Sequence, residues 1–297
     1  MTATTTAPVT APPGRPRTSL SGVGLVLAAG FSVHSGSAVA ASLFPQAGVW
    51  PVVAMRLTFG AVLLLAVCRP AIRGRSRADW GVVVAFGAVL AGMNTIFYAA
   101  IERIPLGAAV TLEVLGPLVL SVVAARRASA WLWAVLALGG VLLLGQSGFD
   151  RLEPLGAALA LVAGAFWAGY IVLSARAGSR FPKADGLALA MVVASVLTLP
   201  LGVAGAGTAL LEPPVLALGL TVALLSSVLP YTLELIALRQ LPTATFAVLM
   251  SLGPAIAAGA GLVILGQALT WSELAAVGLV VVASIGAVRS GGRRVAA

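Results

Sequence analysis

Apolar stretches of about 20 residues recur along the chain, and each is long enough to span the hydrocarbon core of a bilayer as one helix. Short segments that carry charged residues, Pro or Gly separate them. The alternation of apolar and polar residues that an outer-membrane barrel requires is not found. The pattern predicts ten transmembrane helices, at residues 20–43, 49–68, 80–100, 106–125, 129–145, 154–175, 186–205, 214–238, 243–266 and 271–289.

Composition leads to the same class, an all-α integral membrane protein. Only 9% of the 297 residues are charged, whereas a soluble domain has about 25%. The single cysteine, Cys68, excludes an intrachain disulfide and a cysteine-rich metal site. The sequence has no nucleotide-binding loop, zinc-ligand spacing or nucleophile–base–acid set. We therefore expect no cofactor, no metal site and no catalytic residue.

The 18 Lys and Arg residues are distributed unevenly over the connections between these helices. Only Arg103 and Arg151 fall on one side of the membrane, and Arg56 lies within a span. The other side, with both chain ends, has Arg15, Arg17, Arg69, Arg73, Arg75, Arg77, Arg126, Arg127, Arg176, Arg180, Lys183, Arg239, Arg289, Arg293 and Arg294. Positive residues collect in the cytoplasm. We expect a multi-pass protein of the bacterial inner membrane with cytoplasmic termini, in which the net charge of +9 does not indicate a nucleic-acid partner.

The first 19 residues are rich in Thr, Pro and Ala and predict a disordered cytoplasmic tail, and residues 290–297 predict a basic one. Arg15 and Arg17 before an apolar run resemble a signal peptide, with Ala38-Val39-Ala40 as its cleavage site. However, the apolar run is longer than a typical signal sequence and many further spans follow it. It is better interpreted as the first transmembrane helix.

The chain contains an internal repeat. AIERIPLGAAVTLEVLGPLV (residues 100–119) aligns without gaps on ALRQLPTATFAVLMSLGPAI (residues 237–256), at an offset of 137 residues. Two five-helix repeats, at 20–145 and 154–289, would enter the membrane in opposite directions because five is odd. Inverted repeats are typical of secondary transporters, with the substrate site near the midplane between the halves. An old duplication in a membrane protein of any other role is the alternative.

Three segments carry a resemblance to a known family: MRLTFGAVLLL (55–65), ERIPLGAAVTLEVLGPL (102–118) and LPTATFAVLMSLGPAIAAGAGLVILGQ (241–267). The chain resembles EamA-type members of the drug/metabolite transporter superfamily over nearly all of its length. The Leu-Glu-x-x-Gly-Pro pattern at 112–117 is most similar to the threonine/homoserine exporter branch. One departure is that the last segment ends in Gly266-Gln267, where the family usually has Gly-Glu.

Arg56 and Glu113 are ionisable residues within predicted spans, each roughly 10 Å below the outer surface by helical rise. A charge at the bilayer centre costs about 2.5–3.5 kcal/mol on insertion scales, so such residues indicate a functional site. Three interpretations stay open. The two form a structural ion pair, Glu113 carries protons, or the pair binds a zwitterion, with Arg56 on its carboxylate and Glu113 on its ammonium group.

Further polar residues reach the same zone. Asn94 and His34 are candidate substrate-binding residues, as is Tyr231, which aligns with Asn94 through the repeat. His34 is either a packed interhelical residue or a proton-coupling residue, because imidazole changes its charge near neutral pH. Glu234 is either an interfacial residue that extends toward Arg239 or a proton-coupling residue at an inner gate.

Two Gly-Pro pairs are candidate hinges, because proline removes a helical hydrogen bond and frees a carbonyl beside a cavity. They are Gly116-Pro117 and Gly253-Pro254.

The leading hypothesis is a secondary transporter that exports a small metabolite by proton antiport. The resemblance implies an amino acid such as threonine or homoserine. The alternatives are an exporter of another metabolite or a drug-like compound, and a membrane-embedded enzyme or scaffold. The expected partners are the substrate, protons and the lipid bilayer, with a second copy of the chain as a candidate partner in a homodimer.

Overall fold

The computed structural model describes residues 20–125, 128–146, 153–206, 212–241 and 243–292. Every regular element in these ranges is a helix. In chain order they are α1 (Leu20–Ala47), α2 (Val49–Cys68), α3 (Arg77–Ile101), α4 (Leu106–Glu113), α5 (Leu115–Ala125), α6 (Ala128–Gln146), α7 (Pro154–Arg180), α8 (Asp185–Ala206), α9 (Pro213–Ala223), the π-helix η2 (Leu224–Val228), α10 (Leu229–Gln240), α11 (Thr243–Met250), α12 (Gly253–Leu265) and α13 (Trp271–Gly292).

The described residues contain 7 helical segments that are long and apolar enough to cross a membrane, and three shorter apolar ones. The shorter segments are Leu106–Leu120, Trp131–Leu143 and Trp271–Ala287. Large apolar side chains such as Val62, Val135 and Val196 are exposed on the outside of the helices, as a surface in contact with lipid requires. The prediction of an all-α membrane protein is confirmed.

The predicted helix boundaries agree with the structure to within three residues except at the ends of the first and sixth spans, and α7 continues to Arg180, five residues beyond the predicted end at 175. A break was expected at residues 44–46, but α1 continues to Ala47. The chain reverses at Gly48, whose φ of 79° is a conformation that glycine adopts without the steric cost of a Cβ. The N–H of Gly48 still donates to the carbonyl of Phe44 at 2.9 Å. The last helical turn therefore tolerates Pro45, because Pro45 removes only one donor near the helix end.

Two predicted spans are broken in the middle. The 106–125 span divides into α4 and α5 after Glu113, and the 243–266 span divides into α11 and α12 after Met250. Each break lies four residues before a proline, Pro117 or Pro254. Because proline has no N–H, the carbonyl of Glu113 or Met250 lacks its usual helical hydrogen bond. The two breaks are 137 residues apart, as the internal repeat requires.

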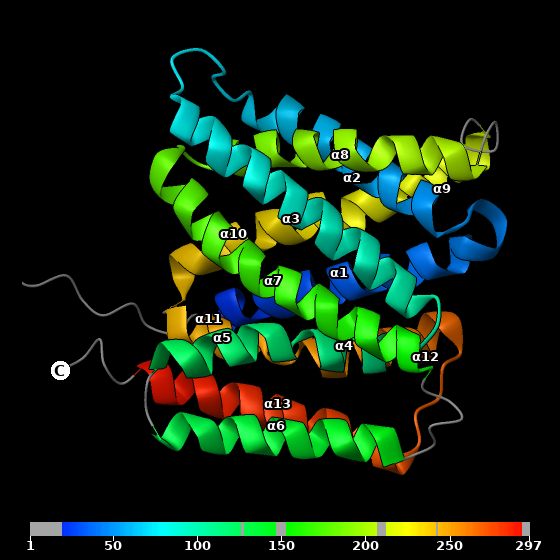
Figure 1. Ribbon diagram of the computed structural model, residues 1–297, viewed down its shortest axis with the longest axis vertical. Coiled ribbons are helices and arrows are strands. Elements are labelled where there is room, and N and C mark those ends of the chain that lie inside the picture. Colours follow the sequence, from blue (N-terminus) through cyan, green and yellow to red (C-terminus); the bar gives the residue numbers. More distant parts are fainter. Residues whose placement is uncertain (1–19, 126–127, 147–152, 207–211, 242, 293–297) are drawn as a thin grey trace, which may run out of the picture.

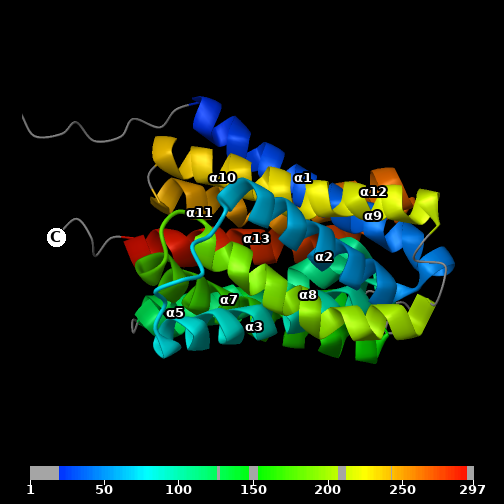
Figure 2. The same ribbon diagram turned by 90° about the horizontal axis from the view of Figure 1, so that it is seen from above.

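The helices form a bundle that Figures 1 and 2 show from two directions. At one edge α6 packs against α13, and at the opposite edge α2 packs against α8. Between these pairs, α3 packs against α7 and α8, while α1 packs against α10 and α12. The broken helices α4 and α12 contact each other in the middle of the bundle.

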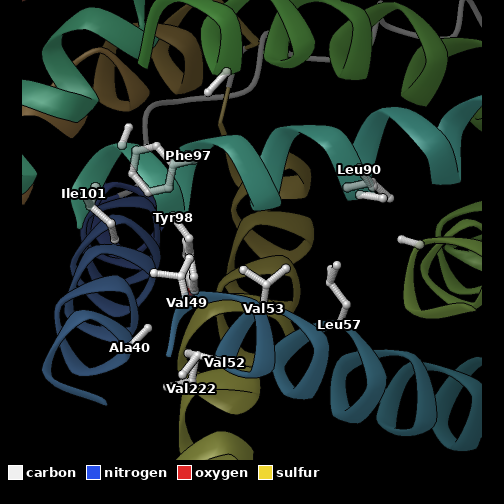
Figure 3. Packing of buried hydrophobic residues seen from close by; sticks show 14 of the residues in the cluster. Ala40, Val49, Val52, Val53, Leu57, Leu90, Phe97, Tyr98, Ile101 and Val222 are labelled. Atoms are coloured by element: carbon white, nitrogen blue, oxygen red, sulfur yellow. The ribbon is translucent and has the colours of Figure 1, made fainter. Parts of the chain in front are cut away.

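The most deeply buried side chains gather where α1, α2 and α3 meet (Figure 3). Tyr98 has no exposed surface and points from α3 toward Val49 and Val53 of α2. Leu43 of α1 and Leu106 of α4 are also buried at this end of the bundle. This end is therefore densely packed.

Contacts between connections define the two ends of the bundle. At one end the guanidinium of Arg75 lies 4.7 Å from the centre of the Phe181 ring, and Arg180 forms a 3.0 Å salt bridge with Asp79. The beginning of α1 and the end of α13 lie at this same end (Figures 1 and 2).

The other end has its own link between the halves of the chain. The side-chain oxygen of Gln267 accepts a 3.0 Å hydrogen bond from the N–H of Leu106 in the first turn of α4. This amide therefore satisfies an N–H that has no partner within its helix. The glutamine at the position of the family's glutamate performs a capping role that needs only an oxygen acceptor.

Candidate functional site

A cavity of about 170 Å³ lies in the middle of the bundle. That space is far larger than one buried water needs. Residues from α1, α2, α3, α4, α7, η2, α10, α11 and α12 line it. Arg56, Glu113, Asn94, His34 and Glu234, which the sequence singled out, all contribute to its wall, as do the candidate hinge residues Gly253 and Pro254.

Arg56 of α2 is 8% exposed and is held from two sides. One terminal nitrogen, Nη1, donates to the hydroxyl of Tyr98 on α3 at 2.8 Å, and the guanidinium lies 5.2 Å from the centre of that ring. The other, Nη2, donates to the backbone carbonyl of Ser226 at 3.4 Å. The Nε of Arg56 has no partner among the described residues. The guanidinium is thus fixed at the cavity with donor capacity to spare.

The carbonyl of Ser226 is free to accept because of Pro230, four residues later. Proline has no N–H, so the usual helical bond to this carbonyl is lost. The helix adapts locally by forming η2, in which the N–H of Leu229 bonds to the carbonyl of Leu224. Such π-helical turns often occur at functional sites. The free carbonyl of Ser226, in the second half of the chain, therefore helps to hold Arg56, which belongs to the first half.

Glu113 is the last residue of α4 and lines the same cavity. No salt bridge within 4.0 Å joins it to Arg56 in the described part of the chain. Of the three interpretations, the direct ion pair is therefore not observed among the described residues. Arg56 has instead turned to Tyr98 and Ser226. The two opposite charges nevertheless line the same cavity.

The break after α4 brings a backbone contact with α7. A Cβ built on Gly164 would collide with the carbonyl oxygen of Glu113, and one on Gly116 would overlap the backbone of Gly164. The predicted hinge residues Gly116 and Pro117 do not line the cavity. Gly116 instead permits the close approach of α5 and α7 beside it.

Asn94 and His34 lie in the cavity wall in different ways. The side-chain nitrogen of Asn94 donates to the carbonyl of Leu90 at 2.8 Å, one turn earlier in α3. His34 makes no hydrogen bond within the described residues, and its Nε2 faces Gly253 of α12, where an added Cβ would lie 3.3 Å away. His34 therefore lies beside one of the two predicted hinges.

Glu234 of α10 also contributes to the cavity wall. Of the two interpretations of Glu234, this placement favours the proton-coupling residue, because its side chain lines the same cavity as Glu113. The rotation of α10 about its own axis determines where the side chain of Glu234 points, and hydropathy does not reveal that rotation. The side chain of Tyr231 lies outside the part of the chain that the structure describes.

Sequence reasoning missed Tyr98, Ser226, Trp167 and Tyr170, all of which hold Arg56 or line the cavity. Tyr98 lies four residues after Asn94 and so shares its helical face. Ser226 lies four residues before Pro230, a spacing that exposes a carbonyl. Trp167 and Tyr170 lie within α7, away from the interfacial belt where aromatic residues normally occur.

Comparison with known proteins bears on what this cavity serves. The model of the EamA-like transporter family matches residues 154–289. The threonine/homoserine exporter RhtA of Escherichia coli (strain K12) is 41% identical over 264 residues, which cover 88% of this chain and 89% of that protein. The chain belongs to the EamA-like transporter family. RhtA of Salmonella typhimurium (strain LT2) has the same identity and coverage.

Membership in the EamA-like transporter family decides between the function classes that the sequence left open. The protein is a transporter and not an enzyme, and the predicted resemblance is confirmed. A solved crystal structure is similar over 93% of this EamA-like chain and 99% of its own, with a TM-score of 0.62 at 18% identity. That likeness supports the fold alone.

Proposed function

We propose that the protein exports a small zwitterionic hydroxy amino acid, such as threonine or homoserine, in exchange for protons. The observation that carries this proposal is one cavity with an arginine, Arg56, and a carboxylate, Glu113, in its wall. The names of the relatives that are 41% identical supply the substrate class. All the proposed site residues belong to one copy of the chain, so the mechanism does not require a homodimer.

The two charged groups suit the two ends of a zwitterion. The planar guanidinium of Arg56 binds the carboxylate, because its donors match the geometry of two carboxylate oxygens. Glu113 accepts hydrogen bonds from the ammonium group. Since the two side chains are not paired with each other, the ligand does not have to break an ion pair before it binds.

Proton exchange follows from the same carboxylate. A proton that reaches Glu113 from the more acidic outside removes the charge that holds the ammonium group, so the amino acid leaves. The proton then departs to the cytoplasm and restores the anionic site. His34 and Glu234 line the same cavity and are candidate carriers of the proton along this route. Asn94 and Tyr231 complete the proposed binding residues.

The finer topology that we propose is ten spans in two inverted repeats, residues 20–145 and 154–289, between cytoplasmic tails at 1–19 and 290–297. The equivalent breaks after Glu113 and Met250 support it. The three shorter apolar segments complete ten spans when added to the 7 longer ones. The arginine-rich end of the bundle faces the cytoplasm of a bacterial inner membrane by the positive-inside rule.

With this orientation the cavity faces inward. Val26 and Glu234 in its wall are only about 9 Å of helical rise from the cytoplasmic ends of α1 and α10. The opposite end contains the dense packing around Tyr98 and Leu43. Movement at the broken helices, with Gly116, Pro117, Gly253 and Pro254 as hinges, would close the inner side and open the outer one.

The test is counterflow of labelled threonine into proteoliposomes, with and without an imposed pH gradient. We expect the wild-type protein to respond to the gradient and Glu113→Gln to have lost that response. Arg56→Lys keeps a positive charge but lacks the two parallel donors of a guanidinium, so transport by this variant should fall roughly tenfold or more. Arg103→Lys, at a half-exposed salt bridge outside the cavity, is the matched control. Wild-type protein that does not transport threonine contradicts the substrate, and Arg56→Lys with full activity contradicts the role of the guanidinium.

A further inference from the structure

The amide of Asn94 has a fixed orientation. Its nitrogen donates to the carbonyl of Leu90 at 2.8 Å, and a carbonyl can only accept. The nitrogen must therefore face Leu90, so the side-chain oxygen, Oδ1, is the atom left over. Asn94 is 4% exposed and belongs to the cavity wall.

The Oδ1 atom of Asn94 accepts no hydrogen bond from any described residue. A buried acceptor without a donor is unfavourable, so such an atom in a cavity wall is satisfied by water or by a ligand. What it can bind is restricted, because Oδ1 has no proton to give. The partner must be a donor such as a hydroxyl or an ammonium group.

The position of Asn94 relative to the charged residues distinguishes these donors. Asn94 lies one helical turn from Tyr98, the residue that holds Arg56, so Asn94 and Arg56 share one side of the cavity. Glu113 belongs to another helix, α4, and takes the ammonium group in the proposed function. Asn94 lies one turn closer to the cytoplasm along α3 than Tyr98, where it can contact the side chain of a ligand held by these two charges.

We propose that Oδ1 of Asn94 accepts a hydrogen bond from the side-chain hydroxyl of the substrate and thereby selects hydroxy amino acids over apolar ones of equal size. The inference rests on the proposed function and deepens it. An apolar pocket discriminates poorly between groups of one shape, whereas a buried polar group left unpaired by the wrong ligand discriminates strongly.

Three neighbouring polar residues in the wall are less suited to this role. The hydroxyl of Ser37 donates to the carbonyl of Val33 at 3.0 Å. The hydroxyl oxygen of Ser226 is inaccessible and faces Gly36. Trp167 can only donate. Val33, Val110 and Val114 have purely hydrocarbon side chains, and the thioether sulfur of Met93 is only a weak acceptor.

Threonine and valine have nearly the same shape and differ in the hydroxyl, so they form the decisive pair. We would compare counterflow of both labelled amino acids into proteoliposomes that contain the full-length wild type, Asn94→Leu, Asn94→Ala or Asn94→Ser. Val84→Leu, on the lipid-facing side of α3, is the control. A serine at 94 would bond to the carbonyl four residues earlier, as Thr111 and Thr198 do, and still present an oxygen.

We expect the wild type to prefer threonine, and both apolar variants to lower the threonine-to-valine ratio by about fivefold. Asn94→Ser should retain part of the preference, and Val84→Leu all of it. If Asn94→Leu does not fold, the smaller Asn94→Ala decides. An unchanged threonine-to-valine ratio in a folded apolar variant overturns the inference. A wild type that transports both amino acids equally well also overturns it, but leaves the proposed export of amino acids intact. A wild type that transports neither overturns the proposed function together with this inference.

Discussion

Arg56 donates a 2.8 Å hydrogen bond to the hydroxyl of Tyr98 and lies over the same aromatic ring. The buried cation thus has a neutral partner, and no residue in the described part of the chain forms a hydrogen bond or salt bridge with the carboxylate of Glu113 in the cavity that both residues line. This arrangement keeps both charges available to a ligand.

Tyr98→Phe tests this anchor. The substitution removes the acceptor of a buried, charged donor, so we expect a loss of about 1–3 kcal/mol in the free energy of unfolding. The thermal midpoint in detergent measures it. Thr198→Val is the control, because the hydroxyl of Thr198 bonds only within its own helix. An equal effect of the two variants would contradict the role of Tyr98.

Double-mutant cycles should show that Arg56 is coupled more strongly to Tyr98 than to Glu113. Residues in contact have coupling energies of about 0.5–3 kcal/mol, and Arg56 contacts Tyr98 directly. We would measure unfolding of Arg56→Ala, Tyr98→Phe, Glu113→Gln and the two double variants. Some non-additivity with Glu113 is also expected, because the two opposite charges line the same cavity. A larger coupling to Glu113 would point to a direct ion pair.

Gly116→Ala should destabilise the protein by roughly 1–3 kcal/mol, the usual range for overpacking. Its new Cβ would overlap the backbone of Gly164, which cannot move aside as a side chain can. Gly259→Ala in α12 is the matched control, since nothing lies within 4 Å of a Cβ there. Thermal unfolding of both variants gives the comparison, and a tolerated Gly116→Ala would show that α5 and α7 separate easily.

Gln267→Ala should destabilise the first turn of α4 by about 1 kcal/mol, because the N–H of Leu106 loses its acceptor. Gln267→Glu should be tolerated, since a carboxylate oxygen accepts the same bond. Hydrogen exchange at Leu106 measures the local effect. Exchange in Gln267→Ala as slow as in the wild type would indicate that water replaces the cap.

The proposed topology predicts where reporters appear. A reporter fused after Arg75, or at the C-terminus, should report the cytoplasm, and one inserted beside Gly48 should report the periplasm. Alkaline phosphatase and green fluorescent protein fusions provide opposite signals. A periplasmic C-terminus would contradict the count of ten spans.

The positions of the helices and of their breaks were determined by the sequence itself. Hydropathy over about 20 residues depends only on local composition, and the missing N–H of Pro117 or Pro254 acts on a carbonyl four residues away whatever surrounds it. The observed α2 (Val49–Cys68) and the division after Glu113 agree with these local properties. That Arg56 and Glu113 belong to one site was also predictable in part, because charged residues within the spans are rare and these two lie at a similar depth.

The partners of those charges were decided only by the tertiary structure. Depth along a helix does not determine its rotation, and a turn through one residue moves a side chain by about 100°. Packing of α2 against α3 and η2 places Arg56 beside Tyr98 and the carbonyl of Ser226. The rotation of α10 likewise places Glu234 in the cavity wall. The directions in which these side chains point depend on packing against residues far away in the sequence. The hydropathy pattern of one helix contains no information about that packing.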